Sequence, residues 1–482
     1  MDRIAALEQK LVELFLANGR LREDLAAASG VIARLEQDNA ELRARLAKNS
    51  GNSGKPPSSD GLKKPRREAG SLRGRSGKKS GGQVGHKGAG LKPVARPDKI
   101  ETHEASECTH CQGALTPSMA TGVEKRQVFD IPEPRLEVTE HRAAIYCCAH
   151  CRGVTRAAFP EGVTGQTQYG PRLRQMAVYY NVGQLIPEDR VAQMMRDLHG
   201  AVSLCSASVV NWVKAQAETI EAVIAHILSR LTTGGVRHLD ETGLRVAGKL
   251  HWLHSVSSAA FTHYRVSPTR GDVPAFLEGG TIVHDHFKPY YAHMSGVDVH
   301  ALRGAHHLRE LKAIAEIEKE PWAEPMTALV IDLNRMKHEA RARGETALVD
   351  AALAAALADY RAILAQGLAL HEALPPLIGK PGARGRKARR AGHNLLIRLR
   401  DYEADVLRFI TNFDVPFTNN EAEQALRMMK VRMKISGCFR TPDGAQVFAK
   451  IRSVISTARK HGLNIAHALS LPPDQLILAF SG

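Results

Sequence analysis

The sequence predicts a multidomain α+β protein with an N-terminal coiled coil, a zinc ribbon, a helical region and an α/β core that is interrupted by a helical insertion. Three observations predict this class. The first 46 residues carry an unbroken heptad repeat, four cysteines form two C-x-x-C pairs, and the pattern changes from helices to short strands near residue 236. A chain of 482 residues is also too long for one domain, and its 43% hydrophobic content is enough for buried cores.

The chain is strongly basic, with a formal net charge of +16. This charge favours a polyanionic partner, of which nucleic acid is the commonest; ribosome association or solubility alone is the alternative. No run of about eighteen apolar residues occurs, which argues against a membrane span, and the start "MDRIAALEQK" lacks the pattern of a signal peptide. We therefore expect a cytoplasmic protein with no membrane partner.

Residues 1–47 are the predicted coiled coil. Leucine occupies every d position except Ala28, and the a positions are Ile4, Leu11, Asn18, Leu25, Ile32, Asn39 and Leu46. Asparagine buried at position a specifies a parallel two-stranded register at some cost in stability. We expect a homodimer or a higher oligomer through this helix; the alternative is an amphipathic helix packed on its own chain.

Residues 48–100 are predicted to be a basic, flexible linker. They contain fourteen Lys or Arg against three acids, and 23 of the 53 residues are Gly, Ser or Pro. A segment of this composition without aromatic residues cannot bury enough apolar surface to fold alone.

Residues 101–160 are predicted to form a zinc ribbon. Cys108 and Cys111 form one pair and Cys148 and Cys151 the other, with 36 residues between the pairs. In a reducing compartment such pairs are typical of metal binding, and four thiolates complete a tetrahedral structural Zn²⁺ site. Residues 126–147 alternate like two strands. Cys147 is an alternative third ligand, but only Cys148 keeps the C-x-x-C spacing with Cys151.

Residues 165–232 are predicted to be helical. Two segments, "EDRVAQMMRDL" and "CSASVVNWVKAQ", are separated by a short turn that contains glycine, as in a helix-turn-helix. Such a pair either binds DNA or is part of a helical core, and the pattern does not distinguish the two.

Residues 233–312 are predicted to be the first part of an RNase H-like core. Strand patterns occur in "VRHLDET", "KLHWLHSVSS", "FTHYRVSP" and "GTIVHDHFK", and a helical crossover is expected in "DVPAFLEG" before the last of them. In this arrangement the first and last strands are adjacent and parallel, so Asp240 and Asp285, near their ends, become neighbours. Asp240 shares a face with His238 and Thr242, and Glu241 points away.

Two carboxylates at contact distance repel each other unless a cation lies between them. Oxygen ligands with an incomplete shell suit Mg²⁺ or Mn²⁺, and two such ions can activate an attacking oxygen and stabilise a leaving one at a phosphodiester. The alternative is that each aspartate is an ordinary hydrogen-bonding residue at the end of a strand.

The chain after the core strands supplies a third acidic site and more basic surface. Residues 313–403 are predicted to be a helical insertion, whose basic stretch before Asp401 is a candidate backbone contact for DNA. Residues 404–482 are predicted to complete the core and add C-terminal helices. They include "TNNEAEQ", which starts a helix; from Ala425 to Lys460 there are nine Lys or Arg and one acid.

The order of these motifs resembles the IS66 family of bacterial insertion-sequence transposases. The resemblance rests on the coiled coil, "KNSGNSGKPPSSDG", the cysteine ribbon, "HLDETG", "VHDHFKPY", "HALRGAHHLREL" and "TNNEAEQALR". It implies a DDE transposase that cleaves DNA at the element ends and joins the 3′-hydroxyls to target DNA. The implied triad is Asp240, Asp285 and Glu423, with two Mg²⁺ or Mn²⁺ ions per site. One departure is Arg303, where the family often has cysteine.

The resemblance also implies small accessory proteins of the same element as partners and a location on the nucleoid. Two other functions fit the residues: a zinc-containing DNA-binding regulator without catalysis, and an RNase H-like nuclease. Glu421 competes with Glu423 for the third position. Thr418 and Glu421 match a capping box, which gives Glu421 a structural task and favours Glu423 as the metal ligand.

Overall fold

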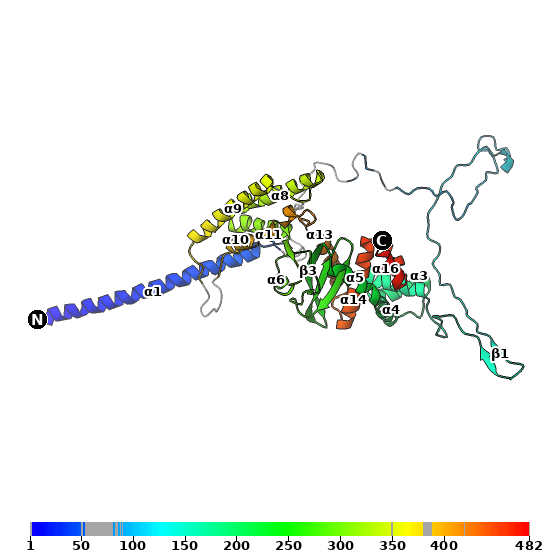
Figure 1. Cartoon of the computed structure of the whole chain (residues 1–482), viewed down its shortest axis with the longest axis horizontal. Coiled ribbons are helices and arrows are strands. Elements are labelled where there is room, and N and C mark those ends of the chain that lie inside the picture. The colour runs from blue at the N-terminus through cyan, green and yellow to red at the C-terminus, as the bar shows by residue number, and fades with distance from the viewer. Residues whose placement is uncertain are drawn as a thin grey trace. The chain divides into compact units, whose positions relative to one another are not determined.

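The fold is described from a computed structural model of the chain (Figure 1), which describes residues 2–49, 52–53, 81, 85–86, 88, 90–348, 350–378, 388–418 and 420–481. Two compact units are present. One comprises Met1–Gly70, Val163–Gln193 and Leu204–Gly482, and the other comprises Ser71–Gly162 and Met194–Ser203. Most of the predicted linker, residues 48–100, lies outside the described residues.

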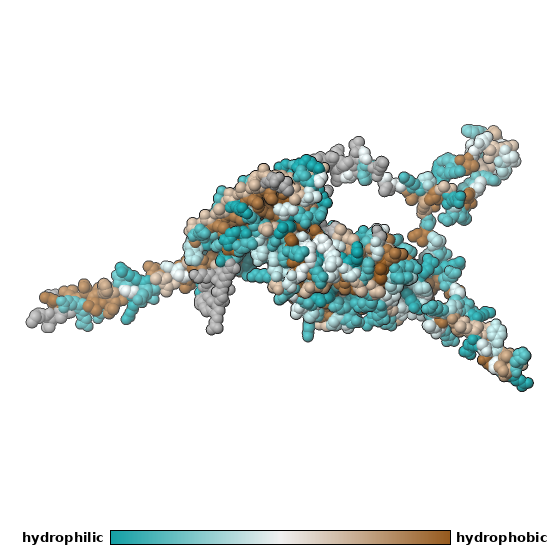
Figure 2. Space-filling model, in the orientation of Figure 1, coloured by the Kyte–Doolittle hydropathy of each residue, from teal (hydrophilic) through white to brown (hydrophobic). Residues whose placement is uncertain are grey.

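The N-terminal segment is one long helix, α1 (Asp2–Ala47). Its heptad residues are largely exposed; for example, Leu11 is 73% and Leu25 70% exposed. Apolar residues follow the helix in the space-filling view (Figure 2). The helix predicted from the heptads is therefore present. Its second strand, and so the oligomeric state, stays a prediction.

The smaller unit contains little regular structure. A 3₁₀ turn, η2 (Pro117–Met119), precedes a short hairpin of β1 (Ile145–Cys147) and β2 (Val154–Arg156). The two strands predicted within residues 126–147 are wrong except at Ile145–Cys147. The apolar residues that alternate there, such as Val128 (91% exposed) and Val138 (89%), have no core to cover, and alternation alone does not form a strand without packing.

The larger unit resumes with helices. These are α2 (Pro171–Val178), the π-helix η3 (Tyr179–Gly183), α3 (Glu188–His199), of which the residues from Met194 on belong to the smaller unit, α4 (Ser206–Thr219) and α5 (Glu221–Thr232). The predicted helix pair corresponds to α3 and α4. Gly200, directly after α3, has a φ of 69°, which suits a glycine at the end of a helix. Val209 and Ala217 on α4 are buried, so one face of this helix belongs to a core.

A five-stranded mixed sheet forms the centre of this unit, in the order β5-β4-β3-β6-β7. A two-residue turn of positive φ at Ala247 and Gly248 joins the antiparallel hairpin of β3 and β4, and β6 and β7 extend the sheet in parallel on the other side of β3. The predicted parallel pairing of the first strand with the returning strand is confirmed. The strands are β3 (Val236–Val246), β4 (Lys249–Ser257), β5 (Thr262–Ser267), β6 (Thr281–His284) and β7 (Val299–Leu302).

Two details of the sheet differ from the prediction. The crossover at residues 272–279 is not a helix. It contains Pro274 and ends at Gly279 and Gly280, both of positive φ, so it is too short and too interrupted to complete helical turns. The first strand also does not end at Asp240, because its antiparallel partner β4 continues to pair with it as far as Val246.

Helices from the end of the chain cover the sheet. Ser453 on α14 (Pro442–Lys460) accepts a hydrogen bond from the backbone N–H of Tyr264 at 2.9 Å, and Thr457 accepts one from Thr262 at 3.1 Å. Helix α13 (Asn420–Ser436) packs against β3 and β4. Two short helices follow, α15 (Ile465–Ala468) and α16 (Pro473–Ala479).

Apart from the first, the helices between β6 and α13 share one hydrophobic core with the edge of the sheet, including Trp322, Tyr360 and Leu396. One of them, over Ala351–Ala373, is long and apolar enough to cross a membrane by length and composition. That is weak evidence of a span, because Tyr360 is buried in this core and its hydroxyl donates to the Leu399 carbonyl. The elements are α6 (Lys288–His293), α7 (Gly304–Ala313), the π-helix η4 (Ile314–Glu318), α8 (Ala323–Ala342), α9 (Asp350–Ala373), α10 (Ala391–Asp401), α11 (Glu403–Val406) and α12 (Arg408–Thr411).

Candidate active site

The two predicted aspartates lie at the same level of adjacent parallel strands. The register of β3 and β6 pairs His238 with Val283. Asp240 and Asp285 each follow two residues later. Burial raises the pKa of Asp240, and the negative charge of Asp285 raises it further. The pairing therefore brings together the two carboxylates that the sequence selected.

Both oxygens of the Asp240 carboxylate have a donor. Oδ1 accepts from the backbone N–H of Glu241 at 2.9 Å, and Oδ2 accepts from Nη1 of Arg303 at 3.1 Å. Nη2 of Arg303 donates to the carbonyl of Leu239 at 2.5 Å. Both side chains of the ion pair are mostly buried, at 14% exposure for Asp240 and 6% for Arg303. The positive charge of Arg303 opposes the rise in the pKa of Asp240 that burial causes.

Glu241 has its own set of partners, which sequence reasoning missed. Its carboxylate accepts from Arg270 at 2.7 Å and from the Tyr290 hydroxyl at 2.7 Å, and its side chain is only 1% exposed. Arg270 also lies over the rings of Trp252 and Phe287, with its guanidinium carbon 5.0 Å and 4.4 Å from their centroids. Burial raises the pKa of Glu241, and Asp285 adds to this rise, so the two carboxylates interact although Glu241 alternates with Asp240 on the strand.

Asp285 is flanked by two histidines that hold its backbone. Nδ1 of His284 accepts from the backbone N–H of His286 at 3.2 Å, so Nε2 of His284 is the atom that donates to Nδ1 of His300, 3.0 Å away. His286 has a φ of 65°, a conformation that is uncommon outside glycine. Asp285 itself forms no ion pair with any residue in the described parts of the chain.

The third predicted residue, Glu423, lies in the first turn of α13. The sheet register places Asp240, Ser255 and Tyr264 on one face, and the Tyr264 hydroxyl donates to the carbonyl of Ala425 at 3.2 Å. The start of α13 therefore lies over the face that bears Asp240. The side chains of Glu423 and of its competitor Glu421 lie outside the described residues.

Oxygen donors of this kind fit a hard divalent cation. The negative charge of Asp285 raises the pKa of Asp240, and a cation between the two carboxylates removes that repulsion. Within the described ranges, no three His, Cys, Asp or Glu side chains gather into a metal site.

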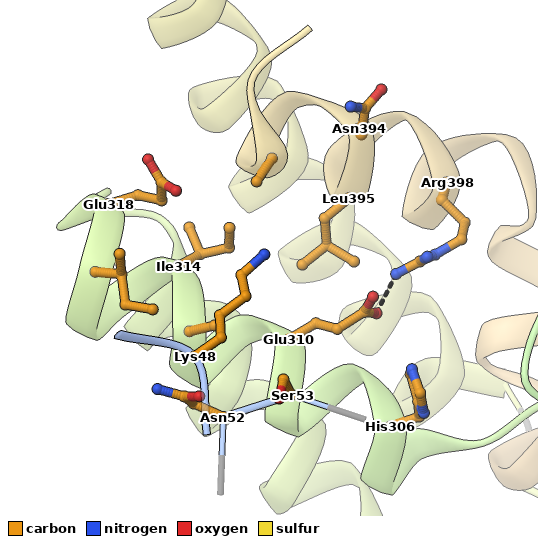
Figure 3. A pocket seen from close by; sticks show the side chains of 13 residues that line it. Lys48, Asn52, Ser53, His306, Glu310, Ile314, Glu318, Asn394, Leu395 and Arg398 are labelled. Carbon is orange, nitrogen blue, oxygen red and sulfur yellow. Dashed lines mark hydrogen bonds and ion pairs between the residues drawn. The ribbon is translucent and has the colours of Figure 1, made fainter. Parts of the chain in front are cut away.

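A pocket of about 370 Å³, lined by both polar and apolar side chains, lies between the residues that follow α1, the α7–η4 segment and α10. Lys48 points into it, and the Glu310 carboxylate is joined to the Arg398 guanidinium (Figure 3). Burial favours the neutral form of Glu310, but His307, whose Nδ1 lies 3.7 Å from the carboxylate, and the Arg398 charge outweigh it and lower the pKa to about 2. Burial lowers the pKa of His306, which lines the pocket, and the charges of Glu310 and Asp285 oppose that change.

The two cysteine pairs form knuckles of the same design. The N–H of Cys108 donates to the Gly113 carbonyl at 2.8 Å, and that of Cys148 donates to the Gly153 carbonyl at 2.9 Å. The fourth residue of the turn after each first cysteine has a left-handed φ, 59° at Gln112 and 55° at Arg152.

Both knuckles favour thiolates. Backbone N–H donors lower the pKa of Cys108, where His110 is the largest cause, and of Cys148, where Cys151 is. Cys147 lies in β1 and donates to the Arg152 carbonyl at 3.6 Å, outside the knuckle. In the described parts of the chain the two pairs do not meet in one cluster, so the four-thiolate zinc site stays a prediction.

Comparison with known families agrees with this organisation. A family model described as "Transposase IS66 family" matches residues 166–447, and one described as "zinc-finger binding domain of transposase IS66" matches residues 105–152. A family of unknown function matches residues 4–92. No curated protein matches the chain.

Proposed function

The chain belongs to the IS66 family of transposases, and on this premise we propose that it cuts DNA at the ends of an insertion sequence and joins the freed 3′-hydroxyls to target DNA. The observation that carries the proposal is the parallel pairing of β3 and β6 in the mixed sheet, because Asp240 and Asp285 each follow two residues after the paired His238 and Val283. Asp240, Asp285 and Glu423 are the residues proposed to hold the metal ions.

Two Mg²⁺ or Mn²⁺ ions per site, when bound, supply charge stabilisation for an attacking and a leaving oxygen at phosphorus. The contribution of the protein is to place the ligands. The sheet fixes Asp240 through Arg303 and the N–H of Glu241, and the His284–His300 pair holds the turn that carries Asp285. Water and then the DNA 3′-hydroxyl are the nucleophiles, so no side chain has to act as one.

The remaining parts of the chain serve DNA binding and assembly in this proposal. Cys108, Cys111, Cys148 and Cys151 hold one structural Zn²⁺, and α1 pairs with a second copy through its heptads. The α3–α4 pair and the basic segments contact the DNA backbone, for which clustered Lys and Arg are the usual ligands. The protein acts on the nucleoid in the cytoplasm, with small proteins of the same element as accessory partners.

The roles of the acidic residues are tested by single substitutions. Asp240→Asn, Asp285→Asn and Glu423→Gln each remove a charged ligand, so we expect loss of cleavage and of strand transfer while binding to element ends remains. The measurement is gel-based cleavage and strand transfer on labelled end duplexes, beside an electrophoretic binding assay.

Glu421→Gln is the matched control, because it makes the same chemical change two residues away in the same helix turn. As a lost capping interaction it is expected to cost about 0.5–1 kcal/mol of stability and to leave most activity. Equal loss of chemistry in Glu421→Gln and Glu423→Gln at unchanged melting temperature contradicts the assignment. Strand transfer from precleaved ends with a 3′-hydroxyl, and none from ends that lack it, distinguishes a transposase from a nuclease.

A further inference from the structure

Arg303 contacts the candidate metal site from the far edge of the sheet. It directly follows β7 and is the residue before α7, and β6 lies between β7 and β3. Its guanidinium nevertheless reaches β3 and makes two contacts there, one with the Asp240 carboxylate at 3.1 Å and one with the Leu239 carbonyl at 2.5 Å. Two donors from one planar group fix the position of Arg303 as well as that of Asp240.

This contact changes the charge that a metal ion meets. Asp240 and Asp285 together carry two negative charges, and the buried guanidinium offsets one of them. A cation beside a carboxylate repels a second cation on the same group, and the repulsion is larger in a buried site than in water. Asp285, in contrast, has no ion pair with any residue among those described.

We propose that Arg303 is a positioning residue of this site: it orients Asp240 and offsets its charge, so that the protein without DNA binds a divalent cation weakly. The negative charge that completes the site then comes from Glu423 and from a DNA phosphate. The inference rests on the proposed function, because it requires Asp240 to be a ligand. If Arg303 only stabilised the fold, removal of its charge would weaken metal binding or leave it unchanged. If it offsets the charge of Asp240, removal of its charge strengthens metal binding.

The experiment titrates Mn²⁺ into the full-length, zinc-loaded protein without DNA and follows free Mn²⁺ by its electron paramagnetic resonance signal. Arg303→Gln keeps a hydrogen-bond donor and removes the charge. We expect it to bind Mn²⁺ about tenfold more tightly than the wild type, a difference of about 1.4 kcal/mol. Arg303→Lys keeps the charge and is expected to stay within about threefold of the wild type.

Arg303→Met is a second charge-free variant with a side chain of similar length, for use if Arg303→Gln disturbs folding. It is also expected to bind Mn²⁺ more tightly than the wild type. An Arg303→Gln or Arg303→Met protein of unchanged melting temperature that binds Mn²⁺ as weakly as the wild type, or more weakly, overturns the inference. So does an equal tightening in Arg303→Lys.

Asp240→Asn separates this failure from failure of the proposed function. If Asp240→Asn binds Mn²⁺ as well as the wild type, Asp240 is not a ligand and the proposed metal site is wrong. If Asp240→Asn loses binding and the charge-free variants do not gain it, the metal site stands and only the role of Arg303 is wrong.

Discussion

At Gly304 a single added methyl group tests the packing that positions helix α13, which carries Glu423. A Cβ built at Gly304 would lie 2.1 Å from Cε2 of Phe417 and 2.5 Å from its Cδ2. Carbon atoms in contact prefer separations of about 3.5–4.0 Å, so Phe417 must move by roughly 1.5 Å in Gly304→Ala. Phe417 is 5% exposed and its ring packs against Phe409 with centroids 4.9 Å apart, which leaves little room for that movement.

The magnitude follows from two opposing effects. Overpacking of this kind typically costs about 1–3 kcal/mol, and the better helix propensity of alanine recovers at most about 1 kcal/mol. We expect a net loss of about 1–2 kcal/mol, which for a domain of this size lowers the melting temperature by about 2–8 °C. Because Phe417 lies three residues before α13, its displacement also shifts Glu423, and a shift of about 1 Å can reduce cleavage by up to a hundredfold.

The assay is thermal unfolding together with end cleavage on the same preparations. Gly271→Ala is the control, since a Cβ there has no atom within 4 Å, and it should leave both measurements near wild type. Phe417→Leu in the Gly304→Ala background removes the outer ring atoms and should restore part of the lost stability. Wild-type stability and full cleavage in Gly304→Ala refute the reasoning.

Three further predictions concern the zipper, the ribbon and a buried lysine. A fragment of residues 1–47 should dimerise in sedimentation, and Asn18→Leu with Asn39→Leu should raise its stability and relax its oligomeric state; a monomer at high concentration argues against the zipper. Metal analysis should find one Zn²⁺ per chain, and Cys108→Ser with Cys151→Ser should lose it, whereas retained fold and metal contradict the ribbon. Burial lowers the pKa of Lys337 from 10.5 to about 8. The folded protein therefore binds fewer protons than the unfolded chain between pH 8 and 10.5. Over this range the stability of the wild type relative to Lys337→Met should rise by up to about 3 kcal/mol, as measured by urea titrations. If the stabilities of the two proteins change in parallel with pH, the lowered pKa of Lys337 is wrong.

The parallel pairing of β3 with β6 was predictable because it depends only on the order of the strands and the lengths of the connections between them. Short strands joined by turn-length gaps form a meander, and a longer connection returns the next strand to a position beside the first. Residues at equal distance along parallel neighbours then meet, as Asp240 and Asp285 do. The long helix α1 was equally predictable, because its heptads need no information from the rest of the fold.

The contacts around the carboxylates were not predictable, because they join segments that the sequence keeps apart. Arg303 is 63 residues from Asp240, and Tyr290 is 49 residues from Glu241. Only the sheet order, with the unpredicted strand β7 at its edge, shows that Arg303 reaches Asp240. Four-residue strands such as β7 carry too little periodicity to be recognised in the sequence. The helix expected at residues 272–279 does not form, because Pro274 and the glycines of positive φ at the end of this segment interrupt it.

The distribution of arginines explains how a chain of net charge +16 maintains an acidic site. Positive charge is not spread evenly over the carboxylates, because Asp240 pairs with Arg303 and Glu241 pairs with Arg270, each within 3.1 Å. Both arginines also make other fixed contacts, with the Leu239 carbonyl and with aromatic rings respectively, so neither is free to move onto Asp285. Among the residues that the structure describes, Asp285, on the turn that ends β6, then has no ion pair. In the proposed function, a strongly basic protein thus keeps the arginines of this site bound to other groups and leaves the charge of Asp285 to a metal ion.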